Sequence, residues 1–328
     1  MNMAEPLLQV SGLTTVLHLP NGPAPAVDGM DLEVRPRETL GIVGESGCGK
    51  SMLALSLLGL QPDPPAEIAA GSAVFEGADL LSMSPEQLRD IRGRRIGMIF
   101  QEPMTALNPV MQVGEQIAEV CRRHLGLGSR AAWRRAVELL QQVRVPDPDR
   151  RARSYPYQLS GGLRQRVMIA AALACEPAIL IADEPTTALD VTIQAQILDL
   201  IRELQAQNGM AILLITHDLG VIAEMADRVM VMYAGRKIEE APVDPLFAEP
   251  RHPYTRGLLG SVPVLGRRRD RRLHEIDGVV PLPDALPPGC AFAPRCDRPV
   301  AACSRILPAL EPAGGGHRSA CHNPVAGP

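Results

Sequence analysis

A glycine-rich segment, Gly44 to Ser51, restricts the fold of this 328-residue chain more than any other stretch. Its sequence, GESGCGKS, fits the pattern G-x-x-x-x-G-K-S/T. The aliphatic run from Leu40 to Val43 precedes it and predicts a buried strand, and the MLALSLLGL that follows predicts a helix. A strand, a glycine loop and a helix in this order are typical of a phosphate-binding loop. The sequence therefore predicts an α/β protein that binds a nucleotide.

The loop offers several kinds of phosphate contact. Its glycines allow successive backbone N–H groups to point at the phosphates, and the N-terminus of the helix adds a favourable partial charge. Lys50 would neutralise the β- and γ-phosphates, and the hydroxyl of Ser51 would bind Mg²⁺. The expected nucleotide contacts are Gly44, Glu45, Ser46, Gly47, Cys48, Gly49, Lys50 and Ser51.

Two further apolar runs end in residues that suit nucleotide chemistry. The first, AILIADE at 178–184, predicts a central parallel strand that ends in Asp183 and Glu184. Ligands bind at the C-terminal ends of such strands, where Asp183 would hold Mg²⁺ through water and Glu184 would polarise the attacking water. Two acids at a strand end are often without function, and the phosphate loop upstream is what favours catalysis. The second run, MAILLIT at 210–216, ends in His217, a candidate γ-phosphate sensor that alone would more often be structural.

The composition excludes some classes of protein. Hydrophobic residues make up 46% and charged residues 21%, as in ordinary soluble proteins, and the net charge of -4 argues against a general nucleic-acid binder. The N-terminal MNMAEPLLQV has no basic or long apolar region, so no signal peptide is predicted. The longest apolar stretch, 167–182, is interrupted by Glu176 and Pro177 and is shorter than the roughly 20 residues of a spanning helix. We therefore expect a cytosolic chain that reaches a membrane only through a partner.

Further motifs complete a series. Residues 159–167 have the sequence LSGGLRQRV, Gln101 lies in IFQEP, Asp190 ends PTTALD, and His217 lies in LLITHD. Together with the phosphate loop and the acids after the second run, these motifs resemble in kind and order those of ABC-transporter ATPases. The resemblance covers about the first 240 residues.

The resemblance implies a fold and a division into domains. The fold would be a P-loop NTPase with a RecA-like core sheet, an antiparallel β subdomain and an α-helical signature subdomain at about residues 103–170. A small irregular C-terminal extension would follow. The nucleotide-binding domain would span residues 1–240, and the extension would span residues 241–328.

The resemblance also implies an ATP site shared by two cassettes that pack head to tail. ATP on the phosphate loop of one cassette would be capped by the signature motif of the other. The signature contacts to the partner's ATP would be Ser160, Gly161, Gly162 and Gln165, and Asp190 would belong to the D-loop. The catalytic residues would be Glu184, His217 and Gln101, the Mg²⁺ ligands would be Ser51, Gln101 and Asp183, and further ATP contacts would be Gln101, Asp183 and His217.

Two positions depart from the family pattern. The family usually stacks adenine on an aromatic residue near the N-terminus, whereas residues 11–29 contain no Phe, Tyr or Trp, and His18 is their only ring of this kind. Leu163, the fifth signature residue, stands where Gln or Met is more common, and we expect little effect from it. Because the loop lysine, Glu184 and His217 are retained, we expect the ATP site of this chain to hydrolyse ATP.

Three segments resemble the ATPases of oligopeptide and dipeptide importers: HPYTRGLLGSVP at 252–263, YPYQLSGGLRQRV at 155–167 and QEPMTALNPVMQVGEQI at 101–117. The resemblance implies a subunit that hydrolyses ATP to power peptide uptake, bound peripherally at the cytoplasmic face of the cell membrane. Its partners would be a second, similar ATPase in a heterodimer, two transmembrane permeases, and an extracytoplasmic peptide-binding protein that contacts the permeases. No nucleic-acid partner is expected.

Other functions stay open on the sequence. The importer could carry nickel or another small solute. A soluble ABC ATPase of translation or DNA repair would usually have two cassettes or a long inserted coiled coil, whereas this chain has one phosphate loop. An exporter cassette is usually fused to membrane helices, which the sequence does not predict.

Four of the seven cysteines lie near the C-terminal end, with the spacing C-x5-C-x6-C-x17-C. Disulfides are disfavoured in a reducing cytosol, the usual C-x2-4-C zinc knuckle is absent, and buried thiols suit a Pro- and Gly-rich tail poorly. Four thiolates suit a 4Fe–4S cluster, and the importer resemblance implies one on Cys290, Cys296, Cys303 and Cys321. Zinc and unliganded thiols stay as alternatives. The basic run at 266–272 is predicted to be a solvated linker.

Overall fold

The computed structural model describes residues 5–187, 189–261 and 276–325, and the basic run at 266–272 lies outside these ranges. The chain forms two compact units, which we call the phosphate-loop unit and the signature unit. Of the described residues, the phosphate-loop unit contains 6–34, 39–82, 215–261 and 276–325, and the signature unit contains 5, 35–38, 83–187 and 189–214. Residues on both sides of position 240 belong to the phosphate-loop unit, so the domain division at this position stays a prediction from the family resemblance.

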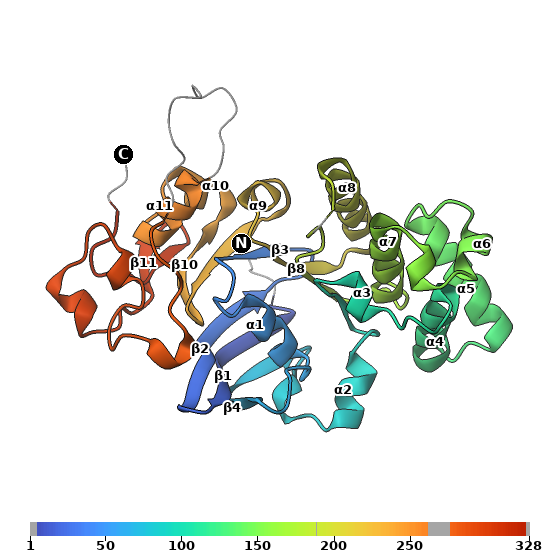
Figure 1. Cartoon of the computed structure of the whole chain (residues 1–328), viewed down its shortest axis with the longest axis horizontal. Coiled ribbons are helices and arrows are strands. Elements are labelled where there is room, and N and C mark those ends of the chain that lie inside the picture. The colour runs from blue at the N-terminus through green and yellow to red at the C-terminus, as the bar shows by residue number, and fades with distance from the viewer. Residues whose placement is uncertain (1–4, 188, 262–275, 326–328) are drawn as a thin grey trace. The chain divides into compact units, whose positions relative to one another are not determined.

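An antiparallel sheet forms one part of the phosphate-loop unit, in the blue region of Figure 1. Its strands are β1 (Leu8–Leu19), β2 (Gly22–Val34), β4 (Ala66–Phe75) and β5 (Ala78–Asp79). They follow the order β2-β1-β4-β5, and neighbouring strands are antiparallel. Buried and more exposed residues alternate along much of β1 and β2, as in a sheet with one solvated face.

A second sheet region in the same unit carries the phosphate loop. Its strands are β3 (Thr39–Val43), β9 (Arg228–Tyr233), β10 (Arg236–Pro242), β11 (Glu311–Gly314) and β12 (His317–Ser319). They follow the order β11-β12-β10-β9-β3, in which β3 and β9 are parallel. All residues of β3 are buried, as the aliphatic run before the loop predicts. The last two strands of the chain thus extend a sheet region that also holds the strand before the phosphate loop.

The helices of the phosphate-loop unit are short. They are α1 (Lys50–Leu57), α9 (Leu219–Met225), α10 (Val243–Ala248) and α11 (Pro253–Gly260). Four 3-10 turns are η1 (Leu80–Ser82), η3 (Pro283–Ala285), η4 (Ala293–Arg295) and η5 (Ala301–Ser304). Helix α1 begins directly after the glycine loop, as predicted. From residue 276 onward, regular structure in the described part consists of such turns and two short strands, so this part of the extension is irregular.

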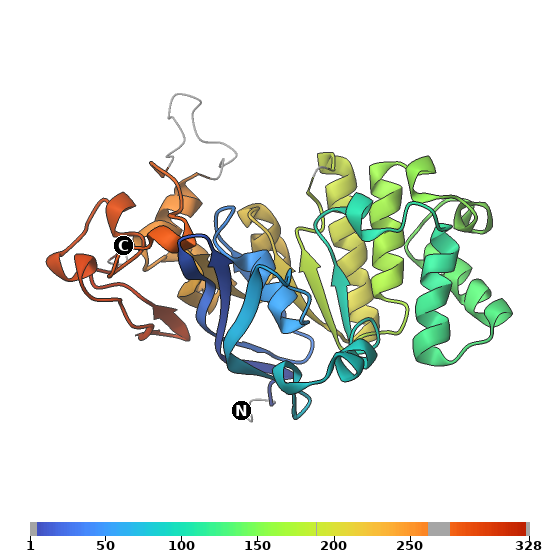
Figure 2. The ribbon, with the colours of Figure 1, turned by 60° about the horizontal axis from the view of Figure 1, so that its bottom comes forward.

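The signature unit combines three strands with a run of helices, coloured from teal through green to yellow in Figure 2. Its strands are β6 (Ile96–Ile99), β7 (Ile179–Asp183) and β8 (Ala211–Ile215). Its helices are α2 (Pro85–Ile91), α3 (Pro103–Ala106), α4 (Val113–Leu125), α5 (Ser129–Gln142), α6 (Pro148–Ala152), η2 (Pro156–Gln158), α7 (Gly161–Ala172) and α8 (Val191–Asn208). The strands follow the order β8-β7-β6, and all residues of β7 and β8 are buried, as their apolar runs predict. No helix in the described ranges is both long and apolar enough to cross a membrane.

Helices α4 and α6 of the signature unit approach each other at a glycine. Gly114 is buried in α4, and a Cβ atom added to it would lie 2.7 Å from Cβ of Ala152 and 2.8 Å from the carbonyl oxygen of Ala152. These separations are well inside van der Waals contact. The two helices therefore pack at a distance that only glycine allows.

The Gly114→Val substitution tests this packing. Because the added side chain collides with Ala152, we expect the free energy of unfolding to fall by about 3 kcal/mol. Urea unfolding of the full-length chain measures the change. Glu119 is exposed on the same helix, and Glu119→Val should cost less than about 1 kcal/mol, because only helix propensity and a weak surface attraction to Arg122 change there. Equal losses in the two variants would contradict tight packing at Gly114.

Candidate nucleotide site

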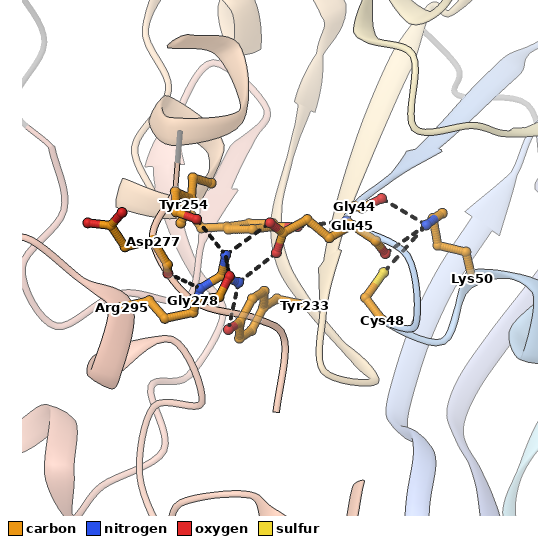
Figure 3. Close-up of polar contacts among 10 residues, drawn as sticks. Gly44, Glu45, Cys48, Lys50, Tyr233, Tyr254, Asp277, Gly278 and Arg295 are labelled. Atoms are coloured by element: carbon orange, nitrogen blue, oxygen red, sulfur yellow. Dashed lines mark hydrogen bonds and ion pairs between the residues drawn. The ribbon is translucent and has the colours of Figure 1, made fainter. Parts of the chain in front are cut away.

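The lysine of the phosphate loop is buried, and it bonds to the backbone of its own loop, as Figure 3 shows. Lys50 is 5% exposed, and its Nζ donates hydrogen bonds to the carbonyl oxygens of Gly44 at 2.8 Å and Glu45 at 3.0 Å. Burying an ammonium group is costly unless acceptors surround it, and the loop supplies two from its own backbone. The lysine is thereby held at the start of α1, where the helix N-terminus also favours an anion.

Two glycines give the loop backbone angles that other residues rarely adopt. The φ angle is +80° at Gly47 and +103° at Gly49. A Cβ atom at Gly49 would lie 2.4 Å from the carbonyl oxygen of Ala26, whereas a Cβ atom at Gly47 would have open space around it. Gly49 is therefore required by the backbone angle and by the close approach of β2, and Gly47 by the angle alone.

Cys48 lies inside the loop. Its side chain is buried, and its Sγ is 3.8 Å from Nζ of Lys50. Burial raises the pKa of the Cys48 thiol, although the charge of Lys50 opposes this shift. The thiol is therefore protonated at neutral pH and is a poor nucleophile.

His217 follows β8 and is exposed. Its neighbour Asp218 caps helix α9, where Oδ1 accepts hydrogen bonds from the N–H groups of Gly220 at 2.8 Å and Val221 at 3.3 Å. The hydroxyl of Thr216 accepts a hydrogen bond from the N–H of Asp218 at 3.0 Å. These bonds fix the backbone at both neighbours of His217, so its exposed ring projects from a defined position.

In the signature unit, Glu184 directly follows β7 and is joined to Gln101. Nε2 of Gln101 donates a hydrogen bond to Oε2 of Glu184 at 2.9 Å, and the hydroxyl of Thr187 donates to the same oxygen at 2.8 Å. The φ angle of Glu184 is +47°, which non-glycine residues rarely adopt. Asp183, the last residue of β7, is buried. The structure thus brings two predicted catalytic residues together at a strained strand end, a feature that clusters at functional sites.

The signature residues open helix α7. Ser160 is the N-cap and is exposed, its side chain makes no capping hydrogen bond, and Gly161 and Gly162 form the first turn. The exposed start of this helix is suited to an anion. Gln165 is placed differently, because it is 2% exposed and its Nε2 donates to the carbonyl oxygen of Pro185 at 2.5 Å. The side chain is therefore used inside the unit to hold the segment after Glu184, and its contact with a partner's ATP stays a prediction.

Two other predicted residues have local partners. Oδ1 of Asp190 accepts a hydrogen bond from the N–H of Ile193 at 2.9 Å, so Asp190 caps helix α8. His18 is exposed on β1, and its Nε2 lies 2.7 Å from Oε2 of Glu67 on β4. The ring predicted to stand in for an aromatic adenine platform is therefore held beside a carboxylate.

The tail cysteines lie close enough to affect one another's protonation. Burial raises the pKa of Cys290, Cys296 and Cys321, to about 11 for Cys321, and neighbouring tail thiols add to each shift. Backbone N–H groups directed at the sulfurs oppose it, such as that of Arg298, 3.5 Å from Sγ of Cys296. Among the residues that the structure describes, no group of three or more His, Cys, Asp or Glu side chains is arranged to hold a metal ion.

Three residues that the sequence did not predict as site residues each contact a predicted one. Thr187 supports Glu184, whereas Tyr254 and Arg295 both contact Glu45, as Figure 3 shows for Glu45. Tyr254 lies in the HPYTRG segment, one of the three that resemble peptide importers, and Arg295 lies between the tail cysteines Cys290 and Cys296. Sequence patterns marked these segments but not their contact with the phosphate loop.

Two family models match the sequence. The ABC transporter model matches residues 27–187, and the oligopeptide/dipeptide transporter C-terminal region matches residues 238–303. A putative peptide import ATP-binding protein of Brucella melitensis is 51% identical over 327 residues, covering 97% of this chain and 97% of the relative. A probable peptide ABC transporter ATP-binding protein of Sinorhizobium fredii is 52% identical over 318 residues, covering 97% of this chain and 95% of the relative.

Solved structures share the fold. The dimeric structure of MJ0796, a bacterial ABC transporter cassette, has a TM-score of 0.65 and 27% identity, and covers 72% of this chain and 98% of that one. The structure of cbiO1 from Clostridium perfringens, part of the ABC transporter complex cbiONQ, has a TM-score of 0.61 and 27% identity, over 74% of this chain and 91% of that one. These similarities confirm the predicted α/β fold of a P-loop NTPase.

The two loop glycines form a matched pair for a test of nucleotide binding. Gly49→Ala strains the backbone and drives a methyl group into the Ala26 carbonyl, so we expect Mg–ATP affinity to fall about 100-fold. Gly47→Ala strains the backbone alone, so a loss of about tenfold is expected. Calorimetric titration of the full-length chain measures both, and thermal unfolding without nucleotide controls for folding. Equal losses would show that the approach to Ala26 is not the deciding constraint.

Proposed function

The chain belongs to the ABC transporter family, and we propose that it is the ATP-hydrolysing subunit of an importer that moves di- or oligopeptides across the cytoplasmic membrane. One observation carries the proposal: the same chain matches the ABC transporter model and the model of the oligopeptide/dipeptide transporter C-terminal region. Two relatives that are named as peptide-transport ATP-binding proteins match nearly the whole chain. In this proposal, ATP hydrolysis on this chain therefore drives peptide uptake.

In this proposal Glu184, Asp183 and Gln101 of the signature unit take part in ATP hydrolysis. Glu184 accepts the proton of the attacking water, and the bonds from Gln101 and Thr187 to one carboxylate oxygen orient it for this task. The amide nitrogen of Gln101 is used in that bond, and its amide oxygen is the atom suited to Mg²⁺. The other Mg²⁺ ligands are the Ser51 hydroxyl and the Asp183 carboxylate, the oxygen donors that this ion prefers.

The cations and polar groups of the phosphate-loop unit bind the nucleotide. Lys50 exchanges its carbonyl acceptors for the oxygens of the β- and γ-phosphates, which carry more negative charge. His217 projects from the end of β8 and contacts the γ-phosphate. An Mg²⁺ ion held by Ser51, Gln101 and Asp183 would supply positive charge against the charge that develops on the phosphates during transfer to water.

A second cassette completes the ATP site. The exposed start of α7, with Ser160, Gly161 and Gly162, supports contact with the phosphates of a partner's ATP. A solved cassette that is similar to this chain is dimeric. The assembly consists of this chain, a second similar ATPase and two permeases, which receive peptide from an extracytoplasmic binding protein. The chain is therefore peripheral, at the cytoplasmic face of the membrane.

We also propose that the tail binds a 4Fe–4S cluster through Cys290, Cys296, Cys303 and Cys321. Four thiolates are the donor set for such a cluster. Backbone N–H groups already point at three of the sulfurs and favour their thiolate form. Because the cysteines are not arranged around a metal in the structure described above, cluster binding requires them to move together as well as to lose their protons. When bound, the cluster cross-links a loop-rich segment that has few buried side chains of its own.

The Glu184→Gln variant tests the ATPase proposal in the transporter reconstituted with its permeases and partner ATPase. We expect the wild type to hydrolyse ATP faster when a mixture of di- and tripeptides is supplied with the binding protein. Because an amide cannot accept the proton, hydrolysis at this chain's site should fall at least ~100-fold in the variant while ATP stays bound. The partner's catalytic glutamate is replaced in both samples, so that only this chain's site contributes.

Glu203 offers the control, since its carboxylate is half-exposed and pairs with Arg144. Glu203→Gln should retain the wild-type rate. Full hydrolysis in Glu184→Gln would contradict the catalytic assignment. If Ni²⁺ stimulates hydrolysis and peptides do not, the ATPase assignment would hold and the proposed transported substrate would be wrong.

The cluster proposal is tested by anaerobic purification followed by iron, sulfide and zinc analysis and an absorption spectrum. We expect four irons per chain and a broad visible band from sulfide-to-iron charge transfer. Cys296→Ala should lower the iron content because it removes a ligand. Cys175→Ala removes a half-buried cysteine outside the tail and should leave the iron content unchanged. Stoichiometric zinc without iron would overturn the proposal.

A further inference from the structure

Glu45, the second residue of the phosphate loop, is bound by a residue 250 positions further along the chain (Figure 3). The guanidinium group of Arg295 forms two hydrogen bonds with its carboxylate, from Nη1 to Oε2 at 2.6 Å and from Nη2 to Oε1 at 3.0 Å. Such a two-point pair fixes orientation as well as distance. The Arg295 side chain is 6% exposed and that of Glu45 is 28% exposed, so water screens the pair only in part.

The position of Arg295 is set by the C-terminal extension. Its Nε donates to the carbonyl oxygen of Asp277 at 2.8 Å, and Nη2 also donates to the carbonyl oxygens of Ile276 at 3.1 Å and Gly278 at 3.2 Å. Three consecutive carbonyl groups therefore cradle one guanidinium group. Because these acceptors and Arg295 itself all belong to the extension, the extension presents a preformed cationic fork to the loop.

An aromatic cluster anchors the extension beside this fork. The ring of Phe292 packs edge-on against Tyr233 and Tyr254, each with ring centres 5.3 Å apart, and all three rings are buried. The Arg295 guanidinium lies 5.8 Å from the centre of the Tyr233 ring. In a chain with few aromatic residues, this cluster joins two parts of the extension, Phe292 and α11, to β9 close to the phosphate loop.

The backbone of Glu45 is held as firmly as its carboxylate. Its N–H donates to the hydroxyl oxygen of Tyr254 at 2.8 Å, and its carbonyl oxygen accepts from Nζ of Lys50. Glu45 therefore connects two residues of the extension, Arg295 and Tyr254, to the lysine of the loop. A movement of Glu45 would shift the carbonyl group that holds Lys50.

The charge of Glu45 is the reason that the loop needs such a partner. An unpaired carboxylate in a loop that binds phosphates would repel them, because the interaction of like charges is only weakly damped near a protein surface. We propose that Arg295 is a positioning residue for nucleotide binding: through its ion pair with Glu45 it holds the phosphate loop in its binding conformation and cancels this repulsion. The inference rests on the proposed function, since the ligand is taken to be ATP.

The proposal is tested with Arg295→Met in the full-length chain and in the reconstituted transporter. Coulomb's law for one uncompensated charge near the phosphates gives an expected rise of about tenfold in the Kd for Mg–ATP. In the transporter, the KM for ATP should rise by a similar factor while kcat at saturating ATP stays unchanged, because Glu184 and Gln101 are untouched. A purely structural role would lower the amount of active protein, and with it kcat, without this selective effect on KM.

A double-mutant cycle isolates the ion pair. In a Glu45→Gln background there is no carboxylate to leave unpaired, so adding Arg295→Met should change Kd by less than about twofold. Arg295→Lys keeps the charge and loses the two-point geometry, so its Kd should lie between those of the wild type and Arg295→Met. This variant keeps the proposal testable if Arg295→Met does not fold.

Arg256 provides a matched control, because it forms an ion pair with Asp297 near the same turn without contacting the phosphate loop. Arg256→Met should leave Kd within about twofold of the wild type. Wild-type affinity in Arg295→Met, or an equal loss with and without Glu45→Gln, would overturn the inference. A wild-type chain that binds no ATP would overturn the proposed function instead.

Discussion

The buried ammonium group of Lys50 is the charge around which the phosphate loop is organised. Its acceptors are carbonyl groups at the start of the same loop, so the chain must curl back toward its own lysine within a few residues. That path brings the backbone at Gly49 against β2, where a Cβ atom has no room. The geometry of this loop determines where strand β3 ends and where helix α1 begins.

Glu45 gives the same loop a negative charge, and this charge requires a cation beside it. Its carbonyl group helps to hold Lys50, so the residue cannot move outward without disturbing the lysine. Its carboxylate must then be neutralised in place, and Arg295 supplies the cation from the C-terminal extension. In the proposed mechanism the extension is therefore part of the nucleotide site, and not only a connection to other subunits.

Local sequence predicts the parts of this site that depend on neighbouring residues. The short aliphatic runs before Gly44, Asp183 and His217 predict β3, β7 and β8, because buried parallel strands need apolar side chains on both faces. Contacts between residues far apart in the sequence could not be predicted, because hydrophobic periodicity does not indicate which distant residues meet. The pair of Glu45 and Arg295 depends on the tertiary packing of three aromatic rings, and the burial of Gln165 beneath the Glu184 segment depends on how α7 packs.

The position of Arg295 between two tail cysteines connects the two proposed sites. Arg295 ends η4, whose first residue, Ala293, donates its N–H to the carbonyl oxygen of Cys290 at 3.0 Å and accepts from the N–H of Cys296 at 3.3 Å. Any change that draws these two cysteines together or apart therefore moves the turn that carries the guanidinium group. A two-point pair is sensitive to rotation, because a tilt of the fork breaks one of its bonds first. In the proposal such a tilt would loosen the hold of Arg295 on Glu45, so the geometry of this tail turn and that of the phosphate loop are coupled through one ion pair.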